Sequence, residues 1–264
     1  MPSHPLAQQV RRLLVPNNFE LSAWWLVIPA AGFGRRMGAD MPKQYLPLDA
    51  RSVLEVTLAR FIGLPGLQGA VLALAPGDTV APAILANFAD FPLFFAEGGA
   101  TRSASVRAAL QFLVDQLGVS EQTWVMVHDA ARPCVRGDDI MALLNVMSAA
   151  EAGGLLAIPV RDTLKRADTQ HHVLGTVSRE SVYHALTPQA FSLGMLAMAM
   201  DQAAQIGAEL TDESSAIEWI GGAPVLVEGH ADNLKITHPN DLPLARLILQ
   251  SQGQWHTPGS NPAG

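Results

Sequence analysis

The chain has 264 residues, of which 49% are hydrophobic and 16% charged, and its net charge is −7. This composition is typical of a globular protein and excludes a disordered chain. The acidic balance argues against nucleic-acid binding, which needs a basic face, and no apolar run reaches the ~20 residues of a membrane span. The single cysteine, Cys134, excludes an intramolecular disulfide and favours a reducing, cytoplasmic location.

Both ends of the chain lack the periodicity of the middle. Residues 1–20 carry Pro, Gln and Asn, and residues 253–264 are rich in Gly, Pro, Ser and Asn, so we expect two flexible extensions. Residues 21–252 between them are expected to form a single domain.

Apolar runs alternate with amphipathic stretches along this domain. The apolar runs expected to form strands are 25–29, 70–75, 124–127, 155–159, 225–227 and 234–237. The amphipathic stretches expected to form helices are 52–62, 103–117, 138–150, 191–206, 212–220 and 239–250. The alternation predicts an α/β fold with a mainly parallel, twisted sheet and helices on both faces, with ligands beyond the carboxyl ends of the strands. The polar stretch 161–180 interrupts this rhythm and is expected to leave the sheet as a β-hairpin arm.

A glycine-containing segment, PAAGFGRRM (29–37), follows the first strand directly and is itself followed by PKQ (42–44). Small residues let backbone N–H groups approach a polyphosphate, and Arg36 and Lys43 can add charge-assisted hydrogen bonds. The GxxxxGK[ST] pattern is absent, and Met37 stands where a dinucleotide-binding fingerprint needs its third glycine. The alternative interpretation is a glycine-rich turn with solvated arginines.

Two later segments carry acidic candidates. Asp129 follows the strand at 124–127 and can serve as a hard oxygen ligand for Mg²⁺; alternatively it caps a turn or pairs with Arg132. Asp232 lies three residues before Lys235, and this pair can reach metal and phosphate together or form a surface ion pair. Thr211 is expected to cap the helix that follows it.

Taken together, these segments resemble the 2-C-methyl-D-erythritol 4-phosphate cytidylyltransferase family of the non-mevalonate isoprenoid pathway. The segments that carry the resemblance are PAAGFGRRM (29–37), PKQYL (42–46), GGATRSASV (98–106), VHDAARP (127–133), PVRDTLKRA (159–167), HALTPQAF (184–191), TDESSAIE (211–218) and ADNLKIT (231–237). They stand in family order across about residues 24–249.

The resemblance implies a nucleotide-diphospho-sugar transferase-like, Rossmann-like sandwich and a homodimer formed through an arm at about residues 160–181. It implies a magnesium-dependent transfer of CMP from CTP to 2-C-methyl-D-erythritol 4-phosphate, with release of pyrophosphate. It places Ala30, Ala31, Gly32, Gly99 and Ser105 around the cytidine, and Arg36, Lys43 and Lys235 on the reacting phosphates. It places Asp129, Thr163, Arg179, Thr187 and Thr211 at the acceptor, with Thr163 and Arg179 coming from the partner subunit, and leaves Asp129 and Asp232 as metal candidates. This chain has Ala100 where some relatives carry an acid, which leaves the ribose contact there open.

Three alternatives differ from this interpretation. A cytidylyltransferase for another polyol phosphate, such as ribitol 5-phosphate, would share the CTP loop and differ at the acceptor site. A non-catalytic nucleotide-binding module would release no pyrophosphate. A nicotinamide-dependent dehydrogenase would need the glycine that Met37 displaces.

Overall fold

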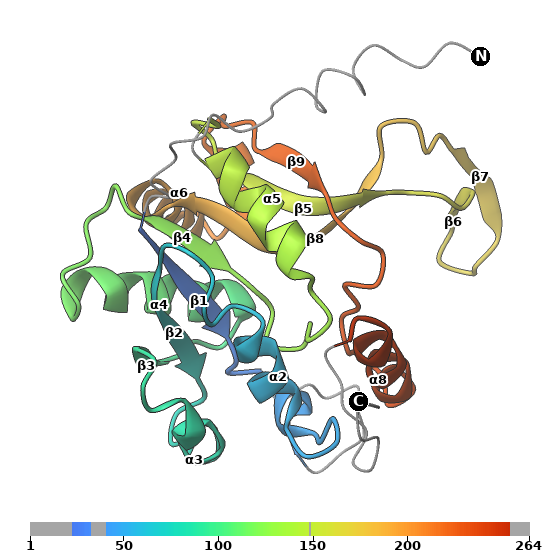
Figure 1. Cartoon of the computed structure of the whole chain (residues 1–264). Helices are drawn as coiled ribbons and strands as arrows, with labels where there is room; N and C mark the ends of the chain where they lie inside the picture. Colours follow the sequence, from blue (N-terminus) through green and yellow to red (C-terminus); the bar gives the residue numbers. More distant parts are fainter. Residues whose placement is uncertain (1–22, 33–40, 148, 254–264) are drawn as a thin grey trace.

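The computed structural model describes residues 23–32, 41–147 and 149–253 (Figure 1). Their main feature is a seven-stranded sheet in the order β3-β2-β1-β4-β8-β5-β9. The strands are β1 (Trp24–Pro29), β2 (Leu67–Leu74), β3 (Leu93–Glu97), β4 (Trp124–Val127), β5 (Gly154–Pro159), β8 (Tyr183–Ser192) and β9 (Val225–Glu228). All neighbours pair in parallel except β8, which runs antiparallel to both β4 and β5. The sheet is therefore mainly parallel, as the sequence predicts.

The order of the strands places a ligand site at β1. From β1 the chain proceeds outward to β2 and β3, and then returns to the other side of β1 to form β4. The carboxyl ends of β1 and β4 consequently flank a topological switch point, where open α/β sheets bind ligands.

Helices cover both faces of the sheet, which confirms the predicted sandwich (Figure 1). The helices are α2 (Val53–Ala59), α3 (Val80–Ile84), α4 (Arg102–Asp115), α5 (Gly137–Met147), α6 (Leu193–Gln205), α7 (Glu213–Trp219) and α8 (Asp241–Ser251), with short 3₁₀ turns η2 (Lys43–Tyr45) and η3 (Leu85–Phe88). Successive residues of a strand point to opposite faces. Leu26 and Ile28 therefore pack with α2 and α5 on one face, and Val27 packs with α4, α6 and α7 on the other.

The predicted arm is a separate two-stranded antiparallel sheet formed by β6 (Leu164–Ala167) and β7 (Val173–Val177). Figure 1 shows this hairpin reaching away from the main sheet. Val173 and Leu174 are 64% and 65% exposed near its tip. The arm thus presents apolar side chains outside the core of its own chain.

Two expected elements are corrected by the structure. The helix expected at 191–206 begins only at Leu193, because β8 continues through Ser192, whose hydroxyl accepts the Met195 N–H and caps α6. The strand expected at 234–237 is not one: Ile236 donates to the Ala131 carbonyl, but no ladder forms around that bond.

Candidate active site

A cavity of about 290 Å³ opens at the carboxyl ends of β1 and β4. Most of the residues that the sequence assigns to nucleotide and phosphate line it together. Its walls are Pro29, Ala30, Ala31, Gly32, Lys43, Gln44, Gly99, Ala100, Thr101, Arg102, Ser105, Asp129, Ala130, Ala131 and Lys235. Arg36 lies outside the described residues.

One wall of the cavity consists of backbone and small side chains. A Cβ atom at Gly98 would lie 2.6 Å from the Ala31 Cβ, and one at Gly99 would lie 2.5 Å from the Ala104 Cβ, so the turn before α4 needs glycine at both positions. The buried Ser105 hydroxyl accepts the Gly99 N–H at 3.2 Å and donates to the Thr101 carbonyl at 2.9 Å. The result is a wall without bulky side chains, held by these hydrogen bonds, which suits a base and its ribose.

The same cavity is also lined by a carboxylate surrounded by cations. Asp129 is 6% exposed. Its Oδ1 accepts from Arg102 Nε at 2.9 Å, and its Oδ2 accepts from Arg132 Nε at 3.2 Å and Lys235 Nζ at 2.9 Å. Burial alone would raise the pKa of Asp129, but Arg102, Lys235 and Arg132 hold that pKa far below its usual range. Asp129 is therefore ionised at all ordinary pH values and binds three cations, of which Arg102 and Lys235 line the cavity.

A second buried carboxylate balances this excess of positive charge. Arg102 donates to both oxygens of Glu213, at 2.7 and 3.0 Å, in a bidentate pair. Burial lowers the pKa of Arg102, but the Glu213 and Asp129 carboxylates outweigh that effect and raise it well above its usual value. Sequence reasoning missed this role of Arg102 and Glu213, because the two residues are 111 positions apart.

A buried histidine supports Asp129 from behind. His128 is fully buried, and burial lowers its pKa to about 4, so its ring is neutral at pH 7. Its Nε2 lies 3.0 Å from the Arg132 carbonyl, which can only accept, so this nitrogen carries the proton. Thr187 then donates to Nδ1 at 3.1 Å and accepts the Asp129 N–H at 3.1 Å. Thr187 thus positions the Asp129 backbone and is not among the residues that line the cavity.

The loop that carries Lys235 is tied down at several points. Asn233 donates to the Thr187 carbonyl at 2.8 Å and accepts from Arg132 at 2.7 Å through its own carbonyl. Lys43 Nζ donates to the Ile236 carbonyl at 2.9 Å, so both cavity lysines lie beside this loop. The predicted phosphate-binding lysines, distant in sequence, are brought to one place.

Besides Thr187, four predicted site residues do not line this cavity. Thr163 and Arg179 are exposed residues flanking the arm strands. Thr211 is exposed, and the cap of α7 is Asp212 and not Thr211, because the Asp212 side chain accepts the Ser215 N–H at 2.9 Å. Asp232 pairs with Arg136 at 2.6 Å and also accepts from Gln252.

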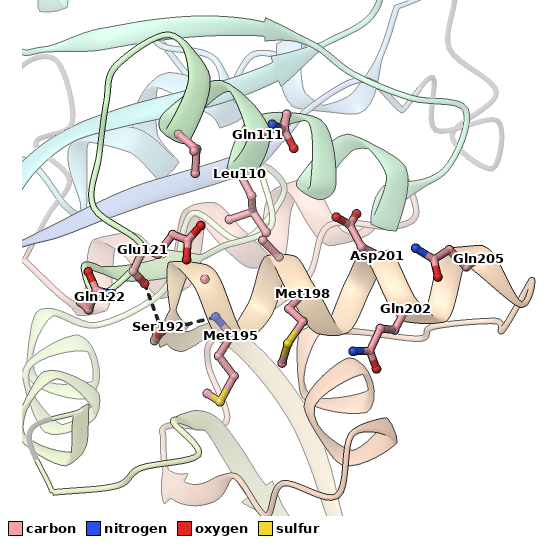
Figure 2. A pocket seen from close by; sticks show the side chains of 13 residues that line it. Leu110, Gln111, Glu121, Gln122, Ser192, Met195, Met198, Asp201, Gln202 and Gln205 are labelled. Carbon is pink, nitrogen blue, oxygen red and sulfur yellow. Dashed lines mark hydrogen bonds between the residues drawn. The ribbon is translucent and has the colours of Figure 1, made fainter.

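A larger cavity, of about 800 Å³, lies between α4 and α6 (Figure 2). Methionine and glutamine side chains form much of its wall, and its charged members are Glu121 and Asp201. Acidic groups repel a triphosphate, and none of the described residues lining this cavity is a lysine or arginine. It is therefore unsuited to the anionic ligands that the smaller cavity favours.

The described residues give two further findings. Nowhere within 23–32, 41–147 and 149–253 are three His, Cys, Asp or Glu side chains grouped so as to hold a metal ion. None of the helices in the described part of the chain combines the length and the apolar character needed to cross a bilayer.

A doubly wound sheet with a glycine-lined, cation-rich cavity at its switch point is suited to a nucleotide, and the class of protein that it fits here is a nucleotidyltransferase. The family model IspD, described as 2-C-methyl-D-erythritol 4-phosphate cytidylyltransferase, matches residues 24–251. The chain belongs to this family.

Individual relatives agree with the family match. The protein of that name from Hahella chejuensis (strain KCTC 2396) is 47% identical over 234 residues, which cover 89% of this chain and 96% of the relative. The crystal structure of 4-diphosphocytidyl-2C-methyl-D-erythritol synthase is similar with a TM-score of 0.75 and 35% identity, covering 86% of this chain and 99% of the other. The crystal structure of the Francisella tularensis 2-C-methyl-D-erythritol 4-phosphate cytidylyltransferase is similar with a TM-score of 0.71 and 34% sequence identity. The match covers 86% of this chain and 100% of the other.

Proposed function

We propose that the cavity at the ends of β1 and β4 is the active site at which this chain joins CTP to 2-C-methyl-D-erythritol 4-phosphate. The chain transfers CMP to that acceptor and releases pyrophosphate, in isoprenoid precursor biosynthesis. The observation that carries the site assignment is that Lys235 and Arg102 bind Asp129 and that Lys43 lines the same cavity, together with a glycine-lined wall, in an otherwise acidic chain.

The acceptor phosphate attacks the α-phosphorus of CTP, a new P–O bond forms, and pyrophosphate leaves with the electrons of the broken bond. The nucleophile is already an anion near pH 7, so the reaction needs no general base. The histidine next to Asp129 is not placed to act as a base, because His128 is fully buried and both its ring nitrogens make hydrogen bonds within the protein. Positioning and charge neutralisation therefore supply the catalysis.

The lysines are the groups that can follow the moving charge. Lys235 contacts Asp129 and Lys43 contacts a backbone carbonyl, and either contact can be exchanged for a phosphate oxygen. We assign Lys43, with Arg36, to the triphosphate and Lys235 to the reacting phosphates, and Ala30, Ala31, Gly32, Gly99 and Ser105 to the cytidine.

We propose that Mg²⁺ enters with CTP and that Asp129 is its protein ligand. Mg²⁺ keeps several waters and uses one or two carboxylates together with substrate phosphates. The donor set fits, because a carboxylate offers about four lone-pair positions, and Arg102, Arg132 and Lys235 use three of them. When bound, the metal would neutralise triphosphate charge.

Asp232 can join that metal site only by leaving Arg136. A titration of activity with Mg²⁺ separates the two roles. If Asp232 binds metal, Asp232→Asn raises the half-saturating Mg²⁺ concentration and Arg136→Gln does not; if Asp232 only holds Arg136, the two substitutions act alike.

We further propose that the chain is a cytoplasmic homodimer in which the β6–β7 arm of one protomer brings Thr163 and Arg179 to the acceptor site of the other, beside Thr187 and Thr211. The exposed Val173 and Leu174 and the absence of Thr163 and Arg179 from the described cavity lining support this arrangement. The buried position of the single cysteine, Cys134, fits a reducing compartment.

Subunit mixing tests the shared site. Arg179→Ala and Lys235→Ala damage different components of each site, so a mixed dimer contains one site with neither lesion. We expect the mixture to regain up to about a quarter of wild-type activity per dimer, half of the dimers being mixed and half of the sites in each intact. No recovery after verified subunit exchange would contradict the proposal.

The acceptor is tested with a panel of polyol phosphates and CTP, with pyrophosphate release as the readout. We expect kcat/KM to be highest for 2-C-methyl-D-erythritol 4-phosphate. A higher value for ribitol 5-phosphate would support the alternative acceptor, and nucleotide binding without any pyrophosphate would support a binding module.

A further inference from the structure

The side chain of Gln44 joins the two parts of the nucleotide site. Gln44 is 4% exposed and lies in η2, next to Lys43. Its Nε2 donates to the Ala30 carbonyl at 2.7 Å and to the Gly32 carbonyl at 3.3 Å. One amide group therefore uses its two hydrogens on two carbonyls of the segment that follows β1.

The first of these carbonyls needs such a donor. The Ala30 N–H makes the last bond to the sheet, with the Ala73 carbonyl at 2.8 Å, after which the chain leaves the ladder. Ala30 is 3% exposed, so an unpaired carbonyl there would be costly. Gln44 supplies the missing bond from the turn that carries Lys43.

This bond also orients a donor toward the ligand side. The C=O and N–H of a trans peptide point in opposite directions. Because the Ala30 carbonyl faces Gln44, the N–H of Ala31 in the same peptide faces away from it. Among the described residues, no hydrogen bond is made by the Ala31 N–H. Ala31 lines the cavity, and we expect a nucleotide bound there to accept this N–H.

We propose that Gln44 is a positioning residue for CTP, which sets the Ala31 peptide and fixes its distance from Lys43. This inference deepens the proposed function. Gln44 touches neither reacting group in this role; it acts through the backbone of the segment after β1 and through its neighbour. The loss of the Gln44 side chain should therefore weaken the binding of CTP more than the binding of the acceptor.

Three variants test the proposal. Gln44→Met keeps the size but cannot donate, and we expect its KM for CTP to rise about tenfold or more, with the acceptor KM within about twofold of wild type. Gln44→Glu places a carboxylate against the Ala30 carbonyl at pH 8, and we expect its KM for CTP to rise more than that of Gln44→Met. Burial against a carbonyl oxygen disfavours the charged form and raises the pKa of the new carboxyl group above its usual ~4.3. On lowering the pH to 6, this group should therefore gain a proton and donate one bond, so the KM for CTP relative to wild type should recover.

The matched control is Gln189→Met. Gln189 is 1% exposed and donates to the Leu186 carbonyl and to Asp212, away from the nucleotide segment. We expect this variant to lose stability while its KM for CTP stays within about twofold of wild type. Thermal unfolding measures the stability of each variant independently of activity.

The outcomes are distinct. Unchanged CTP KM in Gln44→Met, equal losses for CTP and acceptor, or a Gln44→Glu profile parallel to wild type at all pH values would each overturn the positioning role. If wild type released no pyrophosphate, the proposed function would fail. Calorimetric CTP binding to wild type and Gln44→Met would then decide the role of Gln44: about tenfold weaker binding supports it, and equal binding overturns it.

Discussion

Replacing Arg102 by Met removes the cation that compensates a buried carboxylate. The Glu213 side chain is 1% exposed and that of Arg102 is 28% exposed. Removing one partner of a buried pair typically costs about 3–5 kcal/mol, because the other charge stays behind. Glu213→Gln leaves Arg102 paired with Asp129, so we expect only about 1–3 kcal/mol for that change. The double variant leaves no charge unpaired in this contact and should be more stable than Arg102→Met alone.

The assay is urea unfolding of wild type, both single variants and the double variant, from which the coupling free energy follows. The pH dependence gives a second check. Burial raises the pKa of Glu213, and without Arg102 nothing in this contact opposes that rise. A raised folded-state pKa means that the stabilising protonated form is fully present at low pH and is lost as pH rises through that pKa. We therefore expect the deficit of Arg102→Met relative to wild type to shrink from pH 8 to pH 5. Additive single effects, or a deficit that grows as pH falls, would refute the reasoning.

Further changes address the phosphate-binding lysine, the glycine wall and the buried histidine. Lys43→Ala should lower kcat roughly 10²-fold, by analogy with other preorganised charge stabilisers. A near-normal kcat would contradict the assignment of Lys43 to the triphosphate. Gly99→Ala places a Cβ 2.5 Å from the Ala104 Cβ, so we expect a raised KM for CTP, measured by the same kinetics. The folded-state pKa of His128 is lowered from 6.5 to about 4, so its stabilising contribution is present above pH 6.5 and lost as pH falls toward 4. Urea unfolding should then show the part of the stability loss that depends on His128 to be about 2 kcal/mol between pH 7 and pH 5, and His128→Gln should lack it.

Local pattern was sufficient for the elements that position the site. The run at β1 and the polar stretch at β6 and β7 could be predicted, because a buried strand and a solvated hairpin each leave a clear signature in sequence. The strand predicted at 234–237 was wrong, because the apolar residues of this segment pack on α8 and α2 without joining a sheet. Periodicity reports burial and cannot by itself report hydrogen-bond pairing.

The candidate site divides in the same way. The positions of Asp129 and Lys43 at the cavity could be predicted, because a lysine after a glycine turn suits a polyphosphate and a carboxylate at a strand end suits the Mg²⁺ that accompanies it. The contacts of Arg102 with Glu213, and of Gln44 with Ala30, could not be predicted. These contacts join segments that only the folded chain brings together, and an arginine or a glutamine in the sequence does not by itself indicate such a role. The contacts that hold the cavity-lining residues in place are therefore the part of the site that could not be predicted from the sequence.

The most direct test follows the fate of each phosphorus of CTP. CTP labelled at its α-phosphorus and CTP labelled at its γ-phosphorus are incubated separately with the protein, 2-C-methyl-D-erythritol 4-phosphate and Mg²⁺. We predict that the α-label moves to the acceptor, that the γ-label leaves as pyrophosphate, and that neither moves when the acceptor is omitted. An α-label attached covalently to the protein, or a γ-label released as orthophosphate, would contradict the single displacement at this site.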